Sequence, residues 1–223
     1  MNVETFADPA ALAARVATWL SALAHAGRGP FNVALSGGST PRAAYEQLAR
    51  DNSFPWDRAR WFFGDERFVP PDAAQSNFRM AHEAMLYLAP EKNVHPVQTV
   101  GVTPEAAALA YETELKALRG ADTLFDVTLL GLGPDGHTAS LFPGSAMLDE
   151  RTRLTGVVEG LGRTRVTLTY PALDDSAHVA FLVTGAEKRD VLKRVLSGDM
   201  SLPASRIRPK GELVFFVDRE AAA

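Results

Sequence analysis

Residues 124–144 read LFDVTLLGLGPDGHTASLFPG, and this stretch decides the fold. Residues 124–130 are apolar apart from Asp126 and Thr128, which is typical of a central strand in a parallel sheet. The next residues contain four glycines and two prolines, which allow the backbone to approach a ligand closely. Because ligands of α/β proteins usually bind just past such strands, we expect a functional loop around Asp135 and His137.

The rest of the chain alternates predicted strands and helices. The Asp8-Pro9 pair predicts a helix start and Gly27 its end, and further helices are predicted at residues 42–50, 76–88, 187–196 and from 103 onwards. Strands are predicted at residues 31–35, 60–63, 153–158, 165–169, 179–183 and 213–217. This alternation predicts an α/β fold with a mainly parallel sheet covered on both faces. We expect one domain, residues 1–223, with a frayed tail from residue 219.

Composition excludes several classes of function. The net charge of −4 leaves no excess of Lys and Arg to neutralise the phosphates of a nucleic acid. The absence of cysteine excludes disulfides and Cys-ligated zinc, and it fits a reducing compartment. No apolar run approaches the ~20 residues that span a membrane. We therefore expect a soluble cytoplasmic protein, as a monomer or a small homo-oligomer.

A second glycine turn follows the strand at residues 31–35. Residues Ser36, Gly37, Gly38, Ser39 and Thr40 lie where a strand meets a helix N-terminus, so free backbone N–H groups and hydroxyls can face one anion. A phosphate fits such a turn, and the alternative is a tight turn with an N-cap. The Lys of a nucleoside triphosphate loop is absent.

The pattern Gly131-x-Gly133-x-x-Gly136 matches a dinucleotide fingerprint by spacing. However, Pro134 lies where the fingerprint helix begins, and no strand with a terminal acid follows at the required distance. The sequence therefore argues against NAD binding.

Four acidic or basic groups are candidates for proton transfer. Neutral His137 is suited to take a proton from water, or it ties the loop together by hydrogen bonds. Asp135 orients the imidazole, binds a sugar hydroxyl, or forms an ordinary Asp-Gly turn. Asp65 and Glu66, at another strand end, offer a second carboxylate, which Arg67 is expected to neutralise.

Other basic residues complete the candidate site. Arg79, Arg165 and Lys188 lie near the ends of predicted elements, where each is a surface charge or a partner for the anion. The remaining histidines lack the spacing of metal ligands, so we predict no metal site.

Five separated motifs together resemble the 6-phosphogluconolactonase family. They occur in the family's order between about residues 30 and 190 and read LSGGSTP (35–41), GDERFV (64–69) with SNFR (76–79), GLGPDGHTASLFP (131–143), RVTLT (165–169) and TGAEK (184–188). The resemblance implies a Rossmann-like parallel sheet flanked by helices, the NagB/RpiA/CoA-transferase-like fold, without a bound dinucleotide.

The resemblance also implies roles for the candidate residues. Residues 36–40 would bind a phosphate, with Arg79, Arg165 and Lys188 completing the charge match, and His137 corresponds to the family's catalytic histidine. The implied reaction is hydrolysis of 6-phospho-D-glucono-1,5-lactone to 6-phosphogluconate, in the oxidative pentose phosphate pathway. It requires no cofactor, and either Asp135 or Asp65 is expected to assist His137.

Two alternatives remain. The related glucosamine-6-phosphate deaminases follow Asp-Gly-His with Ile-Ala-Phe-Asn-Glu, whereas residues 138–142 here read TASLF and contain no acid. The form GDER at residues 64–67 is also the lactonase-like one. A non-catalytic sugar-phosphate sensor is the second alternative, and retention of the Asp-Gly-His loop argues against it.

Overall fold

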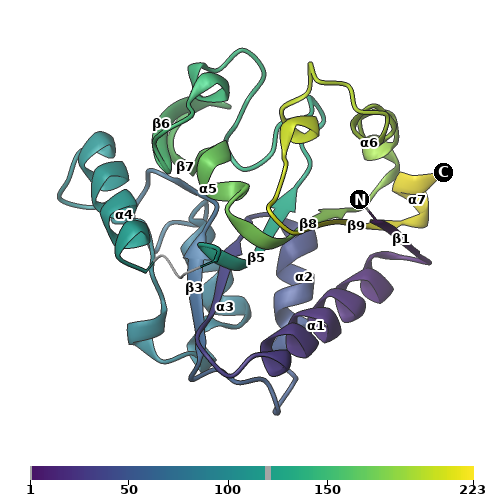
Figure 1. The fold of residues 1–223 in the computed structure, drawn as a ribbon, viewed down its shortest axis with the longest axis horizontal. Coiled ribbons are helices and arrows are strands. Elements are labelled where there is room, and N and C mark those ends of the chain that lie inside the picture. Colours follow the sequence, from purple (N-terminus) through teal and green to yellow (C-terminus); the bar gives the residue numbers. More distant parts are fainter. Residues whose placement is uncertain (1, 119–121) are drawn as a thin grey trace.

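A six-stranded parallel sheet forms the centre of the molecule, as the computed structural model of residues 2–118 and 122–223 shows (Figure 1). The strand order is β1-β9-β8-β5-β2-β3. The bounds are β1 (Asn2–Phe6), β2 (Phe31–Leu35), β3 (Ala59–Phe63), β5 (Phe125–Gly131), β8 (Ser176–Val183) and β9 (Glu212–Asp218). β5 lies in the interior of the sheet, as its apolar sequence predicted.

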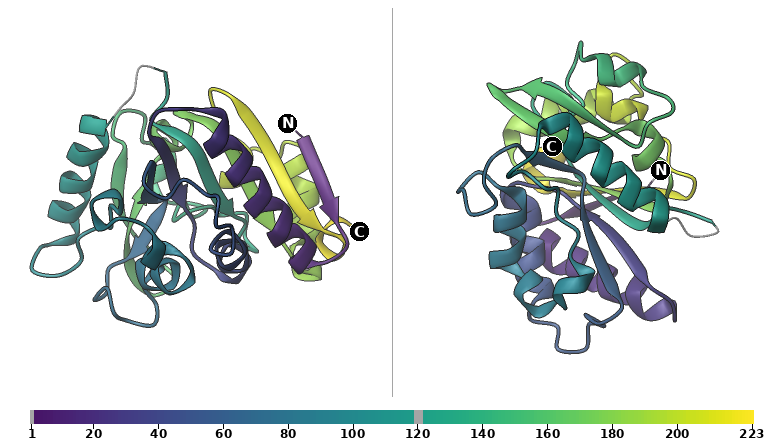
Figure 2. Two further views of the ribbon diagram at one scale, coloured as in Figure 1. Left: turned by 90° about the horizontal axis from the view of Figure 1, so that it is seen from below. Right: turned by 90° about the vertical axis from the view of Figure 1, so that its left-hand side faces the viewer.

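Helices cover both faces of this sheet (Figures 1 and 2). One face carries α1 (Pro9–Ala26), α2 (Ser39–Leu48) and α3 (Asn77–Ala84). The other carries α4 (Pro104–Leu118), α5 (Tyr170–Leu173), α6 (Arg189–Leu196) and α7 (Arg219–Ala222). Successive side chains of a strand point to opposite faces, so Phe181 packs in one core and Leu182 in the other. The prediction of an α/β fold with a covered parallel sheet is confirmed.

A smaller antiparallel sheet lies on the α4 side, in the order β4-β7-β6. It comprises β4 (Asp65–Arg67), β6 (Thr155–Gly160) and β7 (Arg163–Leu168). The β6–β7 hairpin turns through Leu161 and Gly162, with φ of +52° and +73°. Such angles match the right-handed twist of a two-residue hairpin, although a leucine there is strained. Short 3-10 turns complete the chain: η1 (Leu86–Leu88), η2 (Glu91–Asn93), η3 (Ala146–Asp149), η4 (Ala186–Lys188) and η5 (Pro203–Arg206).

The predicted start and end of the first helix are confirmed. The Asp8 carboxylate accepts a hydrogen bond from the Ala11 N–H at 2.8 Å, Pro9 is the first helical residue, and Gly27 is the C-cap. None of the helices in the part of the chain that the structure describes is long and apolar enough to cross a membrane.

Three sequence predictions need correction. The helix predicted at 76–88 ends at Ala84, and a 3-10 turn follows. The structure also has two strands, β1 and β4, that were not predicted. The tail at 219–223 is not frayed, because Asp218 caps α7 through the Ala221 N–H at 2.8 Å and Ala221 is buried.

Candidate active site

A pocket of about 230 Å³ lies where β2 and β5 end. Its walls come from five segments that are far apart in the sequence: the turn after β2, β4, the loop after β5, the β6–β7 hairpin and η4. In parallel sheets the carboxyl ends of the strands meet at one edge, and ligands bind in the crevice there.

The turn after β2 is held by a buried tyrosine. The Tyr45 hydroxyl donates to the Ser36 carbonyl at 2.8 Å and accepts from the Ser36 N–H at 2.9 Å. Gly38 has a φ of +108° and is the N-cap of α2, where no side chain caps the first N–H groups. Those donors remain for an anion. The Thr40 and Thr184 hydroxyls lie 2.6 Å apart and connect this turn to the segment that carries Lys188.

The loop after β5 holds the imidazole of His137 against the carboxylate of Asp135. Asp135 Oδ1 lies 2.5 Å from Nδ1 of His137 and 3.1 Å from its backbone nitrogen. A Cβ on Gly133 would lie 2.0 Å from Nδ1, so the ring needs a glycine there. Burial tends to raise the pKa of Asp135, but the hydrogen bonds from His137 outweigh it and lower this pKa below its usual value. In a neutral imidazole, an ionised Asp135 favours the tautomer with the proton on Nδ1, which leaves Nε2 as the acceptor.

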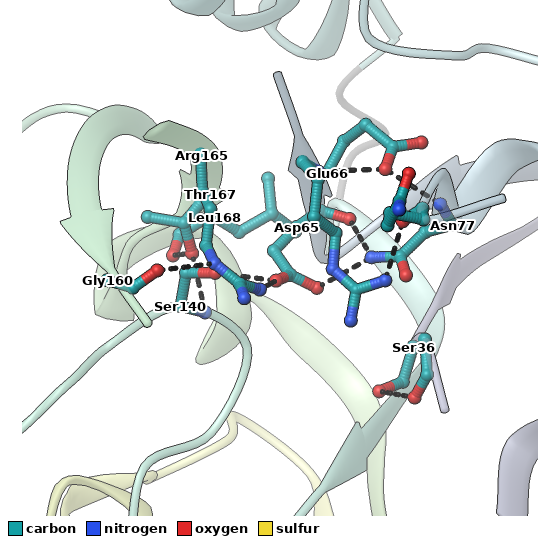
Figure 3. A network of polar contacts seen from close by, with 12 residues as sticks. Ser36, Asp65, Glu66, Asn77, Ser140, Gly160, Arg165, Thr167 and Leu168 are labelled. Atoms are coloured by element: carbon teal, nitrogen blue, oxygen red, sulfur yellow. Dashed lines mark hydrogen bonds and ion pairs between the residues drawn. The ribbon is translucent and has the colours of Figure 1, made fainter. Parts of the chain in front are cut away.

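Asp65 is the centre of a buried polar network (Figure 3). Its carboxylate accepts hydrogen bonds from the Ser140 hydroxyl at 2.5 Å and from Nδ2 of Asn77 at 3.1 Å, and Nη1 of Arg165 lies 3.5 Å away. A Cβ on Gly37 would lie 2.0 Å from Oδ1 of Asn77. Asp65 therefore joins the turn after β2 to the β5 loop and to β7.

Glu66 caps α3. Its carboxylate accepts from the backbone N–H groups of Arg67, Asn77 and Phe78, at 2.7–2.8 Å, and from the Ser76 hydroxyl at 3.1 Å. Burial raises the pKa of Glu66, although these N–H donors oppose the shift. Glu66 is thus structural, and it fixes the position of Asn77.

Three cations line the pocket. Arg165 is buried, and burial lowers its pKa while Asp65 opposes that shift, yet a guanidinium stays charged at neutral pH. Arg67 donates from Nη1 to the Gln75 carbonyl at 2.7 Å, and its buried Nε has no hydrogen-bond partner among the described residues. Lys188 is half-buried and forms no ion pair within residues 2–118 and 122–223. The expectation that Arg67 neutralises Asp65 and Glu66 is wrong, because its side chain bonds elsewhere.

Comparison with known proteins identifies the family of this chain. The model of the family of glucosamine-6-phosphate isomerases and 6-phosphogluconolactonase matches residues 7–216. The chain belongs to this family. A 6-phosphogluconolactonase of Nostoc sp. is 41% identical, over 100% of this chain and 97% of its own. The crystal structure of the Thermotoga maritima 6-phosphogluconolactonase has a TM-score of 0.87 at 36% identity, over 98% and 99% of the two chains. A monomeric glucosamine-6-phosphate deaminase has the same TM-score at only 20% identity, which shows a shared fold alone.

In this family member, most of the site residues predicted from the sequence lie in or beside the pocket. Six of them line the pocket: Ser36, Gly37, Asp65, His137, Arg165 and Lys188. Asp135 contacts His137, and Gly38, Ser39 and Thr40 begin α2 beside the pocket. Arg79 is placed elsewhere: it is exposed, pairs with Glu83 at 2.7 Å and lines a separate hollow with Asp72.

Sequence reasoning missed several residues of the pocket. Arg67 lines it, as does Leu161, which is 70% exposed at the hairpin tip. The signal for Arg67 was its place in GDER, directly after a predicted strand end. Leu161 carried no signal, because its role depends on how the hairpin folds over the pocket. No group of three His, Asp or Glu residues suited to a metal ion occurs in the described ranges.

Proposed function

We propose that this chain is a 6-phosphogluconolactonase, which hydrolyses 6-phospho-D-glucono-1,5-lactone to 6-phosphogluconate in the oxidative pentose phosphate pathway. One observation carries the proposal: His137, paired with Asp135, lines the same pocket as a glycine turn at a helix N-terminus and three cations. This combination suits a substrate that carries both an ester carbonyl and a phosphate. We propose a cytoplasmic location, as the sequence predicts.

His137 acts as the general base. With its Nδ1 proton held by Asp135, Nε2 takes a proton from water as that water attacks the lactone carbonyl carbon. The carbonyl becomes an oxyanion. Arg67 is the proposed donor to it, because its guanidinium lines the pocket and its Nε has no partner among the described residues. The tetrahedral intermediate then collapses, the bond to the ring oxygen breaks, and the imidazolium returns its proton to that oxygen.

The phosphate binds at the other wall of the pocket. The uncapped N–H groups of α2 and the hydroxyls of Ser36, Ser39 and Thr40 are its donors, and Lys188 and Arg165 supply positive charge. Asp65 holds Arg165 in place. The reaction consumes only water, so no cofactor enters it.

Direct observation of lactone loss by NMR tests this function. We expect the purified chain to accelerate hydrolysis far above the spontaneous rate, and we expect His137→Ala to lose that acceleration while it still binds 6-phosphogluconate. Hydrolysis by the parent at the spontaneous rate would contradict the proposal. Ammonia release from glucosamine 6-phosphate would favour the deaminase alternative, whereas product binding without turnover would favour a sensor.

A further inference from the structure

The ring of Phe142 contacts both the imidazole of His137 and the guanidinium of Arg165. The centroids of the Phe142 and His137 rings are 4.6 Å apart, with an angle of 47° between the planes. Cζ of Arg165 lies 5.6 Å from the centre of the Phe142 ring. Phe142 is 9% exposed and is not among the residues that line the pocket. One buried ring therefore contacts two groups of the proposed mechanism.

Gly160, the last residue of β6, makes room for this ring. A Cβ there would lie 2.1 Å from Cε2 of Phe142, which is far shorter than any real contact. The backbone itself does not require glycine, because the φ of Gly160 lies outside the left-handed region. The Gly160 carbonyl also accepts a hydrogen bond from Nε of Arg165 at 3.3 Å (Figure 3). The lack of a side chain at residue 160 therefore leaves room for the Phe142 ring.

We propose that Phe142, seated against Gly160, is a positioning residue that sets the orientation of His137 and Arg165 in the pocket. This inference rests on the proposed function, in which His137 is the base. Asp135 restrains the imidazole at Nδ1 only, and its own side chain is 46% exposed, so the pair needs a second restraint. The Phe142 ring supplies it. A displacement of about 1 Å at a catalytic group can cost about 100-fold in rate.

Gly160→Ala is the sharpest variant, because it adds one methyl group outside the pocket and displaces the ring. We expect kcat to fall about 10- to 100-fold. Gly156→Ala is the matched control: it lies on the same face of β6, and its Cβ would meet Sδ of Met147 at 2.2 Å instead. The control should lose a similar amount of stability, as overpacking does, and keep kcat within about twofold. Equal kcat in the two variants would overturn the proposal.

A double-mutant cycle tests whether Gly160 acts through Phe142. Phe142→Leu alone should lower kcat and, through the lost contact with Arg165, raise KM about threefold or more. Once the ring is gone, the added methyl group has nothing to displace. Gly160→Ala should then change kcat/KM less than about twofold in the Phe142→Leu background. Additive losses would contradict the proposal.

NMR of the histidine side chains distinguishes a failure of the positioning proposal from a failure of the proposed function. The chain has five histidines, and the Cε1–Hε1 signal of His137 is the one that disappears in His137→Ala. Because an aromatic ring shifts the signals of nearby protons, this signal should move in Gly160→Ala and Phe142→Leu and stay in place in Gly156→Ala. A signal unmoved in the first two variants overturns the positioning role even in an active enzyme. A moved signal in a chain without lactonase activity would instead contradict the function.

Discussion

At the scale of single residues, the proposed mechanism requires the charge of Asp135 to fix the tautomer of His137. We expect Asp135→Asn to lower kcat about 10- to 100-fold, less than the loss in His137→Ala, because the imidazolium loses its carboxylate while the ring stays in place. Steady-state rates at neutral pH measure this effect, and an unchanged kcat would remove Asp135 from the mechanism.

The ionised state of Asp135 persists into acid. Its pKa is lower in the folded protein than the ~3.9 of an unfolded chain, so the stability that it contributes is present above that value and is lost as the pH falls through the folded-state pKa. A loss of activity between pH 5 and 7 would therefore not come from protonation of Asp135.

Substitutions of Lys188 and Arg79 should differ in their effect on KM, because only Lys188 is placed to bind the phosphate. Lys188 lines the pocket without an ion pair among the described residues, so Lys188→Ala should raise KM about 10- to 100-fold with kcat nearly unchanged. Arg79 already pairs with Glu83 and donates to the Asp72 carbonyl at 2.7 Å, so Arg79→Ala should change KM less than twofold. A rise in KM for Arg79→Ala equal to that for Lys188→Ala would return Arg79 to the phosphate site, as the sequence predicted.

At the scale of elements, Glu66 controls where α3 begins. Glutamine has one acceptor oxygen, so in Glu66→Gln at least one of the N–H donors of Arg67, Asn77 and Phe78 loses its partner. Each buried donor left unpaired costs about 1–3 kcal/mol, and urea unfolding should show a loss of that size. Because α3 also carries Asn77, which bonds to Asp65, kcat/KM should fall as well.

The pH dependence of the stability lost in Glu66→Gln tests the direction of the pKa shift of Glu66. Burial raises the pKa of Glu66 in the folded state, so its contribution to stability is largest below the unfolded value of about 4.3 and decreases as the pH rises through the folded value. The stability difference between the parent and Glu66→Gln should therefore shrink from pH 4 to pH 7. A difference that widens with pH would mean that the hydrogen bonds outweigh burial.

The strands around the pocket show what sequence can and cannot predict. Apolar strands and glycine turns are local signals, so β2, β5 and their loops were predicted along with Ser36, Asp65 and His137. β4 was not, because its three residues are all charged and become a strand only by pairing with β7. The partners of Asp65 were equally hidden, since Ser140 and Asn77 approach it from segments 75 and 12 residues away. The contact of Asp135 with His137, by contrast, joins two residues of one loop, so the sequence alone suggested it.

At the scale of the whole molecule, the pocket lies at the ends of strands that pack into both hydrophobic cores. Its residues extend from Ser36 to Lys188, and strands β2 and β5 carry side chains into the cores on both faces of the sheet. All three tryptophans, Trp19, Trp56 and Trp61, belong to the α1–α3 side, whereas the β6–β7 hairpin packs on the other. Tryptophan fluorescence and amide exchange in the hairpin therefore report on opposite sides of the sheet.

The sequence predicts a single domain, and on that prediction we expect bound 6-phosphogluconate to stabilise both sides equally. At a ligand concentration of about 100 times Kd, the free energy of unfolding should rise by about 2.7 kcal/mol, whether it is measured by tryptophan fluorescence in urea or by exchange of the slowest hairpin amides. Lys188→Ala, with a weaker phosphate contact, should show a smaller increase at the same ligand concentration in both measurements. If the product protected the hairpin amides and left the fluorescence transition where it was, the two faces of the sheet would unfold separately and the single-domain prediction would be wrong.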